Sequence, residues 1–284
     1  MSSAPQSREA RQSPPLFRDR ADAGLLLGEK LREVLGQDNA SDTERSRGFA
    51  VPAQPSAPSA PGAPSAPGAG ERQPGASIRV FAIPRGGVAV GAGVARCLDE
   101  EFPGTMLDVI VVRKIGHPQA PELGLGAIAE SGEPVFDDEL LAQVALTRAH
   151  LDGVVARERA ELARRIAVYR AGLSGPSGPG SSELPDVAVV VDDGLATGVT
   201  ARAAVRALRG RGVPRIVLAV PVAAEAAVVS MEAELGKAGT GEVVTLVTPR
   251  RFRSVGEWYA DFGQLTDADV LTLLSPGGTT LRAP

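Results

Sequence analysis

The sequence predicts an α/β fold in which helices cover both faces of a mostly parallel, twisted sheet. Short aliphatic runs alternate along the chain with longer segments of helical periodicity, an order typical of parallel sheets. One run, residues 187–191, reads Val-Ala-Val-Val-Val, as expected of a strand that is buried on both faces. Hydrophobic residues make up 43% of the 284 positions, which is enough to form a core.

The individual elements follow from apolar periodicity and from the residues that begin and end helices. Gly210, Gly212 and Pro214 end one helix, whereas Thr147 and Thr266 are suitable N-caps for two others. We expect strands over 78–83, 107–112, 187–191, 215–220 and 242–247, with a hairpin-like segment at 124–130. We expect helices over 17–35, 88–98, 138–144, 148–170, 200–209, 223–235 and 267–274.

Two stretches have compositions that do not favour a packed structure. Residues 1–16 are mostly polar and contain adjacent prolines, so we expect a disordered tail. From Ala50 to Gly70 every residue except Val51 and Gln54 is Ala, Pro, Ser or Gly. Such a tract buries too little apolar area to offset its ordering entropy, so a flexible linker is expected at about 38–76. It interrupts a single predicted domain over 17–284.

Charge and composition argue against several classes of partner. The chain has 30 basic and 34 acidic residues, so its net charge of −4 does not favour nucleic acid. It has no apolar signal core and no stretch that approaches a membrane span, and we therefore expect a cytoplasmic protein with no membrane partner. The single cysteine, Cys97, falls in an expected helix among apolar residues, where burial is favoured over a nucleophilic role.

The clearest functional signal follows the aliphatic run at 187–191. Asp192 and Asp193 stand where the strand ends, and a short loop leads into the next helix. Open α/β sheets bind ligands at this edge. Free N–H groups in the loop and the helix dipole favour a phosphate, whereas the two acids favour sugar hydroxyls or a hydrated cation. A ribose phosphate has both features. The alternative is an ordinary strand–turn–helix whose acids cap the helix.

Two other strand ends carry glycine-rich or basic segments. The strand at 78–83 leads into Pro84-Arg85-Gly86-Gly87, where the glycines permit close approach and Arg85 suits phosphate oxygens. A simple glycine turn is the alternative. The second strand is followed by Arg113 and Lys114, which are either solvated charges or functional cations, and then by His117, either a loop acid or a structural turn residue.

The remaining candidates lie outside the expected core. Residues 249–262 hold four of the ten aromatic residues, and stacking on a flat base or packing of the C-terminal helix against the core would each explain this concentration. The helix at 148–170 mixes arginines with glutamates, which is typical of a solvated face. It is also a candidate for contacts in a homodimer or for a lid.

The segment 187–200 resembles the 5-phosphoribosyl-1-pyrophosphate (PRPP) motif of type I phosphoribosyltransferases, which places two acids after an aliphatic strand and ends a small-residue loop in Thr. Gly194 stands where the family usually has an aliphatic residue. The segment at 84–87 resembles the family's pyrophosphate loop. Together with Phe17-Arg18-Asp19-Arg20 and Val255-Gly256-Glu257-Trp258-Tyr259, these segments resemble a subgroup of uncharacterised bacterial phosphoribosyltransferase-like proteins, over 17–36 and 77–275. The resemblance implies the type I fold with a small hood or lid region.

The resemblance also implies an activity and a set of site residues. The protein would bind PRPP with Mg²⁺ and transfer the phosphoribosyl group to an unidentified nitrogenous base or amine, releasing pyrophosphate. Asp192 and Asp193 would hold the ribose hydroxyls, and Mg²⁺ would be held through PRPP and water, with these two acids as its candidate protein ligands. The expected phosphate loop comprises Ala196, Thr197, Gly198, Val199 and Thr200. The expected pyrophosphate grip comprises Arg85, Gly86 and Gly87, with a cis peptide beside Arg85.

Two further groups of residues receive roles from the resemblance. Arg113 and Lys114 would lie on a mobile loop that closes over PRPP and, with Arg85, would stabilise the departing pyrophosphate. Phe252, Trp258 and Tyr259 would contact the acceptor. Ala196 stands where enzymes that act on 6-oxopurines usually carry Asp, which disfavours hypoxanthine and guanine. The Ala-Thr-Gly sequence at 196–198 is more similar to the corresponding loop of adenine-type enzymes. The alternatives are a non-catalytic regulator that senses PRPP or ribose phosphate, and a scaffold protein with a vestigial site.

Overall fold

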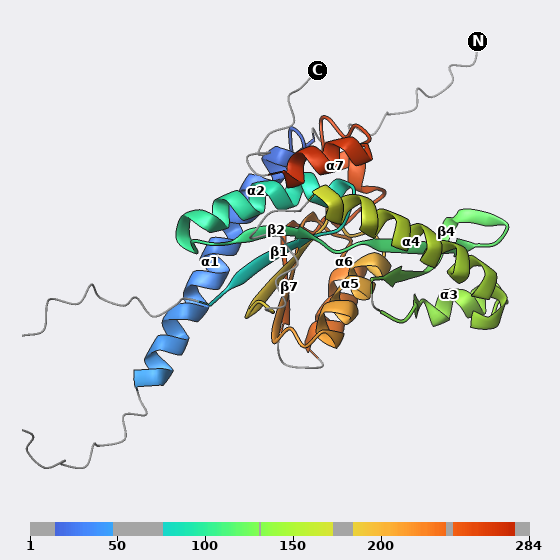
Figure 1. Ribbon diagram of the computed structural model, residues 1–284, viewed down its shortest axis with the longest axis horizontal. Helices are drawn as coiled ribbons and strands as arrows, with labels where there is room; N and C mark the ends of the chain where they lie inside the picture. Colours follow the sequence, from blue (N-terminus) through green and yellow to red (C-terminus); the bar gives the residue numbers. More distant parts are fainter. Residues whose placement is uncertain (1–14, 48–75, 131, 173–183, 237–240, 276–284) are drawn as a thin grey trace, which may run out of the picture.

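A computed structural model of the chain describes residues 15–47, 76–130, 132–172, 184–236 and 241–275 (Figure 1). The first helix, α1 (Arg20–Arg47), extends over the first part of the range expected to be a linker. Residues 1–14 and 48–75, which include most of the expected tail and linker, lie outside the described residues. None of the described helices is long and apolar enough to span a membrane.

The main sheet has five strands, all parallel, in the order β2-β1-β6-β7-β8. Its strands are β1 (Ile78–Ala82), β2 (Met106–Val109), β6 (Val187–Val191), β7 (Arg215–Val222) and β8 (Gly241–Val247). The predicted α/β fold with a mostly parallel sheet is therefore confirmed. Strands β1 and β6, although more than 100 residues apart in the chain, are neighbours, with Ala82 opposite Val191.

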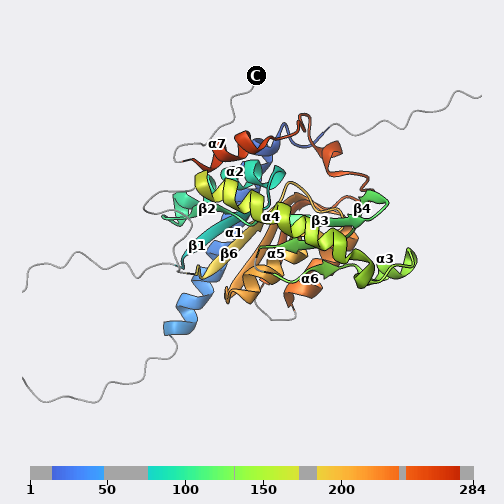
Figure 2. The same ribbon diagram turned by 45° about the vertical axis from the view of Figure 1, so that its right-hand side comes forward.

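Helices cover both faces of this sheet, as the uniformly aliphatic strands predict (Figures 1 and 2). Alternate residues point to opposite faces. Val189 and Val191 pack with the apolar side of α1 and with α2 (Gly86–Glu101). Val190 and Leu218 pack on the other face, against α5 (Val199–Gly210) and α6 (Glu225–Gly236).

A second, antiparallel sheet of three strands lies beside the main one. It contains β3 (Val112–His117), β4 (Ala120–Ala129) and β5 (Val135–Phe136). This corrects the expectation of one strand over 107–112 followed by a loop, because β2 ends at Val109 and the segment with Arg113 and Lys114 is strand β3. Burial explains the difference, since Val112 and Ile115 of this segment are core residues.

The remaining helices lie where the sequence predicts them, with small shifts. Helix α3 (Asp138–Gln143) is short, and the segment expected at 148–170 begins as a 3-10 turn (Arg148–Leu151) before α4 (Asp152–Gly172). Thr266 caps α7 (Asp267–Leu274), accepting a hydrogen bond from the backbone N–H of Asp269. The apolar side of α7 packs in one cluster with residues of α2, α4 and the small sheet, and not with the aromatic residues at 249–262.

Candidate functional site

Two strand-to-helix loops meet at the carboxyl edge of the main sheet. The first connects β1 to α2 through Pro84 and Arg85, and Gly86 and Gly87 begin the helix; the second connects β6 to α5 and begins with Asp192 and Asp193. Because β1 and β6 are parallel neighbours, both loops leave the sheet at the same edge. The N–H of Ile83 donates to the carbonyl oxygen of Val191 at 2.8 Å, which continues the pairing to the start of the loops.

Glycines allow these two loops to touch. A Cβ atom at Gly86 would overlap the Oδ2 atom of Asp193, and one at Gly87 would lie 2.6 Å from the carbonyl oxygen of Val191. Any larger residue at either position would push the loops apart. The peptide bond between Pro84 and Arg85 is cis, as the family resemblance implies. The two motifs found separately in the sequence therefore lie in contact at one edge of the sheet.

The second loop forms a cup of backbone N–H groups. Leu195 fixes the loop to the end of β7, because its N–H donates to the carbonyl of Val222 at 2.9 Å and its carbonyl accepts from the N–H of Ala224 at 2.8 Å. Gly198 has a φ of +76°, a conformation that favours glycine, and stands at the N-terminus of α5. Within the described residues, no protein acceptor is recorded for the N–H groups of 196–200. Ala196 and Thr197 are exposed, so an anion can reach this cup.

The negative charges of Asp192 and Asp193 have different partners in the structure. The Asp192 carboxylate accepts a hydrogen bond from the N–H of Asp193 at 2.9 Å. Burial and the neighbouring Asp193 carboxylate hold the pKa of Asp192 well above its usual range. Burial also raises the pKa of Asp193, but the guanidinium of Arg20 opposes that rise. Asp192 therefore lacks the compensation that a bound hydroxyl or cation would supply.

Arg20 is a site residue to which the sequence analysis gave no role. Its Nε lies 2.8 Å from Asp193 Oδ2, and its Nη1 donates to the carbonyl of Gly263 at 2.8 Å. The guanidinium carbon also lies 3.8 Å from the ring centroid of Phe262. One signal could have identified it: Arg20 is the first residue of α1, where a cation opposes the helix dipole unless an acid elsewhere balances it.

The aromatic residues of the C-terminal segment enclose Asp193 from the other side. The Tyr259 hydroxyl donates to the carbonyl oxygen of Asp193 at 2.6 Å, and its ring lies between Phe17 and Phe262. Burial raises the pKa of Tyr259. Phe252 and Trp258 are partly buried against the same cluster. The segment therefore packs on the N-terminal residues around Phe17, with Tyr259 buried beneath the surface.

The one departure from the family motif has a structural reason. A Cβ atom at Gly194 would lie 2.5 Å from Val255 Cγ1, so Val255 fills the space that an aliphatic side chain at position 194 would occupy. Val255 belongs to the segment that carries Trp258 and Tyr259. The glycine thus allows the C-terminal segment to pack directly on the acidic loop.

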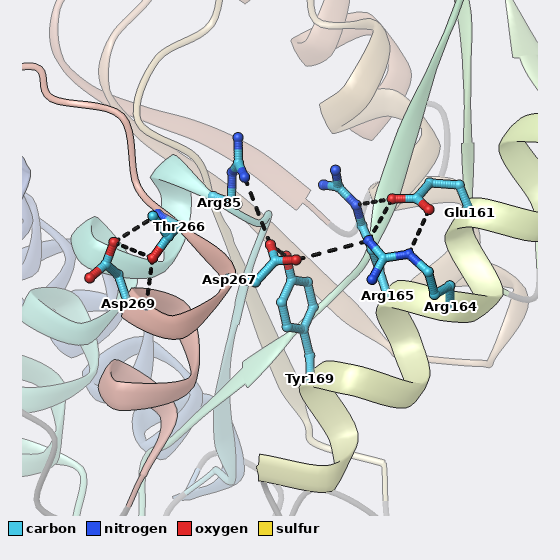
Figure 3. Close-up of polar contacts among 8 residues, drawn as sticks. All are labelled: Arg85, Glu161, Arg164, Arg165, Tyr169, Thr266, Asp267 and Asp269. Carbon is cyan, nitrogen blue, oxygen red and sulfur yellow. Dashed lines mark hydrogen bonds and ion pairs between the residues drawn. The ribbon is translucent and has the colours of Figure 1, made fainter.

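The expected catalytic cations are placed differently from one another. Arg85 is exposed just before α2, and its Nη1 lies 3.8 Å from Asp267 Oδ1 (Figure 3). Arg113 is held by Glu158 of α4, whose Oε2 lies 2.8 Å from Nε and 2.7 Å from Nη2. Lys114 donates to the carbonyl of Glu122 at 2.6 Å, within the β3–β4 hairpin. Arg113 and Lys114 are therefore engaged within the chain, on the small sheet.

Residues 71–233 match the family model of the phosphoribosyl transferase domain, which covers more than half of the chain and includes both loops. The chain belongs to the phosphoribosyl transferase family. Two curated Mycobacterium tuberculosis proteins, "Putative phosphoribosyl transferase Rv0571c" (strain ATCC 25618 / H37Rv) and "Putative phosphoribosyl transferase MT0597" (strain CDC 1551 / Oshkosh), are each 38% identical over 200 residues.

That match covers 70% of this chain and 42% of each relative, so the chain spans less than half the length of the curated relatives. A solved structure is similar over a larger share. The crystal structure of TT1426 from Thermus thermophilus is 34% identical, with a TM-score of 0.60, and the match covers 91% of this chain and 97% of that one.

Proposed function

We propose that this phosphoribosyltransferase binds PRPP with Mg²⁺ and transfers the phosphoribosyl group to a nitrogenous base or amine, with release of pyrophosphate. The observation that carries the proposal is the contact between the two loops, where Gly86 abuts Asp193. It brings the acidic pair, which is followed in the chain by the N–H cup, against the residue that follows Arg85. A ribose that carries a phosphate at one end and a pyrophosphate at the other matches this order of charges.

Each part of the site then has one task. The N–H groups of 196–200, with the Thr197 and Thr200 hydroxyls, bind the 5′-phosphate. The acidic pair binds the ribose hydroxyls, and Arg85 binds the pyrophosphate that approaches the backbone at Gly86 and Gly87. When the C1′–oxygen bond breaks, the electron pair leaves with pyrophosphate and the acceptor nitrogen bonds to C1′. The protein contributes positioning and charge stabilisation.

The donor set at the acidic pair suits Mg²⁺. Carboxylate oxygens are hard ligands, and Mg²⁺ is commonly held by one or two carboxylates, substrate phosphates and several waters. Asp192 and Asp193 are the residues that would contribute to such a site, and Mg²⁺ bound with PRPP would neutralise part of the pyrophosphate charge. Ala196 supplies no carboxylate to an acceptor, which supports an acceptor other than a 6-oxopurine.

One observation favours a second candidate, a regulator that senses PRPP without turnover. Arg113 and Lys114, the cations expected to close over the leaving group, are engaged by Glu158 and the β3–β4 hairpin. A protein that only recognises ribose phosphate does not need cations that stabilise a departing pyrophosphate. Release of pyrophosphate in the presence of candidate bases separates the two functions.

The test is calorimetric titration of PRPP and Mg²⁺ into the wild type and Asp192→Asn. Loss of two hydrogen bonds to a charged group should weaken binding on the order of a hundredfold. Asp138→Asn is the control, because Asp138 is an exposed acid at the start of α3, outside the site, and it pairs with Arg148. Absence of binding to the wild type, or equal binding to wild type and Asp192→Asn, would overturn the proposal.

A further inference from the structure

Three arginines converge beside the pyrophosphate loop, and only one of them belongs to that loop. Arg85 lies 3.8 Å from Asp267 Oδ1, and Arg164 of α4 lies 3.9 Å from Oδ2 of the same carboxylate. Figure 3 shows Arg85 and the arginines of α4 on two sides of Asp267. Arg165 follows on α4 and bonds to Glu161 at 2.9 Å.

The Asp267 carboxylate has a fixed position between these arginines. Tyr169 of α4 donates its hydroxyl to Asp267 Oδ1 at 2.7 Å, and the Tyr169 ring is fully buried. Burial and this hydrogen bond raise the pKa of Tyr169 to about 12, so it is a neutral donor. Asp269, the nearby acid of α7, is turned to Thr266 and caps the helix. The first turn of α7 thus joins α4 to the loop that carries Arg85.

The acids of this cluster do not balance its cations. Three guanidinium groups, on Arg85, Arg164 and Arg165, face two carboxylates, on Glu161 and Asp267, which leaves one positive charge (3 − 2 = 1). Arg85 and Arg164 are also accessible, with 40% and 53% of their side chains exposed. Neither makes a direct hydrogen bond to Asp267 at these distances. Glu161 holds Arg164 through Nε at 2.7 Å and Nη2 at 2.8 Å, so Nη1 is the group that remains for an incoming anion.

We propose that Arg164 is a second pyrophosphate-binding residue, which acts with Arg85 from the opposite side of Asp267. This inference rests on the proposed function, and it assigns the leaving-group subsite to α4 and α7 as well as to the β1–α2 loop. It adds a second accessible cation near Arg85, whereas Arg113 and Lys114 lie on the small sheet. The helix at 148–170 thereby gains a function that its mixed charge did not reveal.

The test compares Arg164→Gln with Arg159→Gln, a matched control on the same helix. Arg159 is 52% exposed, against 53% for Arg164, and lies 3.8 Å from its acidic partner Glu133. Arg164→Gln also removes the pair that Arg164 makes with Glu161 at 2.7 Å, and the ribose 5-phosphate probe reports any structural effect of that loss. Calorimetry would use two probes, Mg²⁺ with inorganic pyrophosphate and ribose 5-phosphate alone. We expect Arg164→Gln to weaken pyrophosphate binding about tenfold and to leave ribose 5-phosphate binding unchanged, with Arg159→Gln like the wild type for both.

The outcomes distinguish this proposal from the proposed function. If the wild type binds pyrophosphate and Arg164→Gln binds it equally well, the role of Arg164 is refuted while the PRPP site stands. Equal weakening of both probes by Arg164→Gln would show a structural effect and would also refute it. If the wild type binds neither PRPP nor pyrophosphate, the proposed function fails first, and the role of Arg164 fails with it.

Discussion

The protein encloses two pairs of carboxylates, Asp192–Asp193 at the carboxyl edge and Asp108–Glu130 on β2 and at the end of β4. One member of each pair has arginine partners: Arg20 for Asp193, and Arg170 and Arg211 for Glu130. The other member accepts a backbone N–H and has a raised pKa, well above the usual range for Asp192 and about 6 for Asp108.

The difference between the pairs lies in their surroundings. Asp192 stands beside an accessible N–H cup and two glycines, so a ligand can compensate its carboxylate. Asp108 is 4% exposed and lies within strand β2, away from the N–H cup. A raised pKa therefore does not identify a binding site by itself; the accessible backbone groups beside the acid do so. Substitutions in the two pairs can test this distinction.

The largest effect is expected at the paired acid of the site. Arg20→Met removes the cation beside Asp193, whose side chain is only 17% exposed, together with the contact on Phe262. An uncompensated, nearly buried charge and the lost stacking should lower the free energy of unfolding by about 3 kcal/mol. Urea denaturation measures this loss.

Arg18→Met is the control for that experiment. Arg18 is 77% exposed and pairs with Asp22, so its loss should not change stability measurably. Equal effects of the two substitutions would contradict the view that Arg20 compensates Asp193.

The second effect is a gain of stability on substitution of Asp108, the buried acid of β2 that lies outside the site. Burial raises the pKa of Asp108 from 3.8 to about 6, so ionisation costs more in the folded than in the unfolded chain. That cost is absent below about pH 4 and complete above about pH 6. Asp108→Asn should therefore be more stable than the wild type by about 2 kcal/mol at neutral pH, and nearly equal to it near pH 4.

Urea denaturation of both proteins at the two pH values checks this sign. PRPP binding should not change, in contrast to Asp192→Asn. A variant less stable than the wild type at both pH values would show that the Asp108 carboxylate is favourable in its ionised form, through Arg79 and Arg170.

Sequence reasoning predicted the sheet and both loops because their signals are local. A doubly buried strand, a pair of acids and a glycine-rich turn each lie within a few residues of one another. The contact between Arg20 and Asp193 joins residues 173 positions apart, and a pattern of neighbouring residues cannot predict which acid Arg20 binds. Strand β3 was missed for a related reason. In the sequence, the charges of Arg113 and Lys114 suggest a solvated loop. In the structure both residues belong to β3, and Arg113 is bound by Glu158 of α4, which lies 45 residues further along the chain.

The smallest expected effect concerns the second contact that holds Asp193. Tyr259→Phe keeps the ring between Phe17 and Phe262 but leaves the Asp193 carbonyl without its donor, which should cost about 1 kcal/mol. Because Arg20 and Tyr259 both act on Asp193, their substitutions should not be additive. Once Arg20→Met has loosened Asp193, Tyr259→Phe should cost less than it does in the wild type.

The double variant Arg20→Met/Tyr259→Phe completes this cycle, measured by urea denaturation with the two single variants and the wild type. A coupling energy above about 0.5 kcal/mol would show that the N-terminal and C-terminal segments hold Asp193 jointly. Additive losses would mean that Arg20 and Tyr259 stabilise separate parts of the fold. In that case the compensation of Asp193 would rest on Arg20 alone, as that of Glu130 rests on its own arginines.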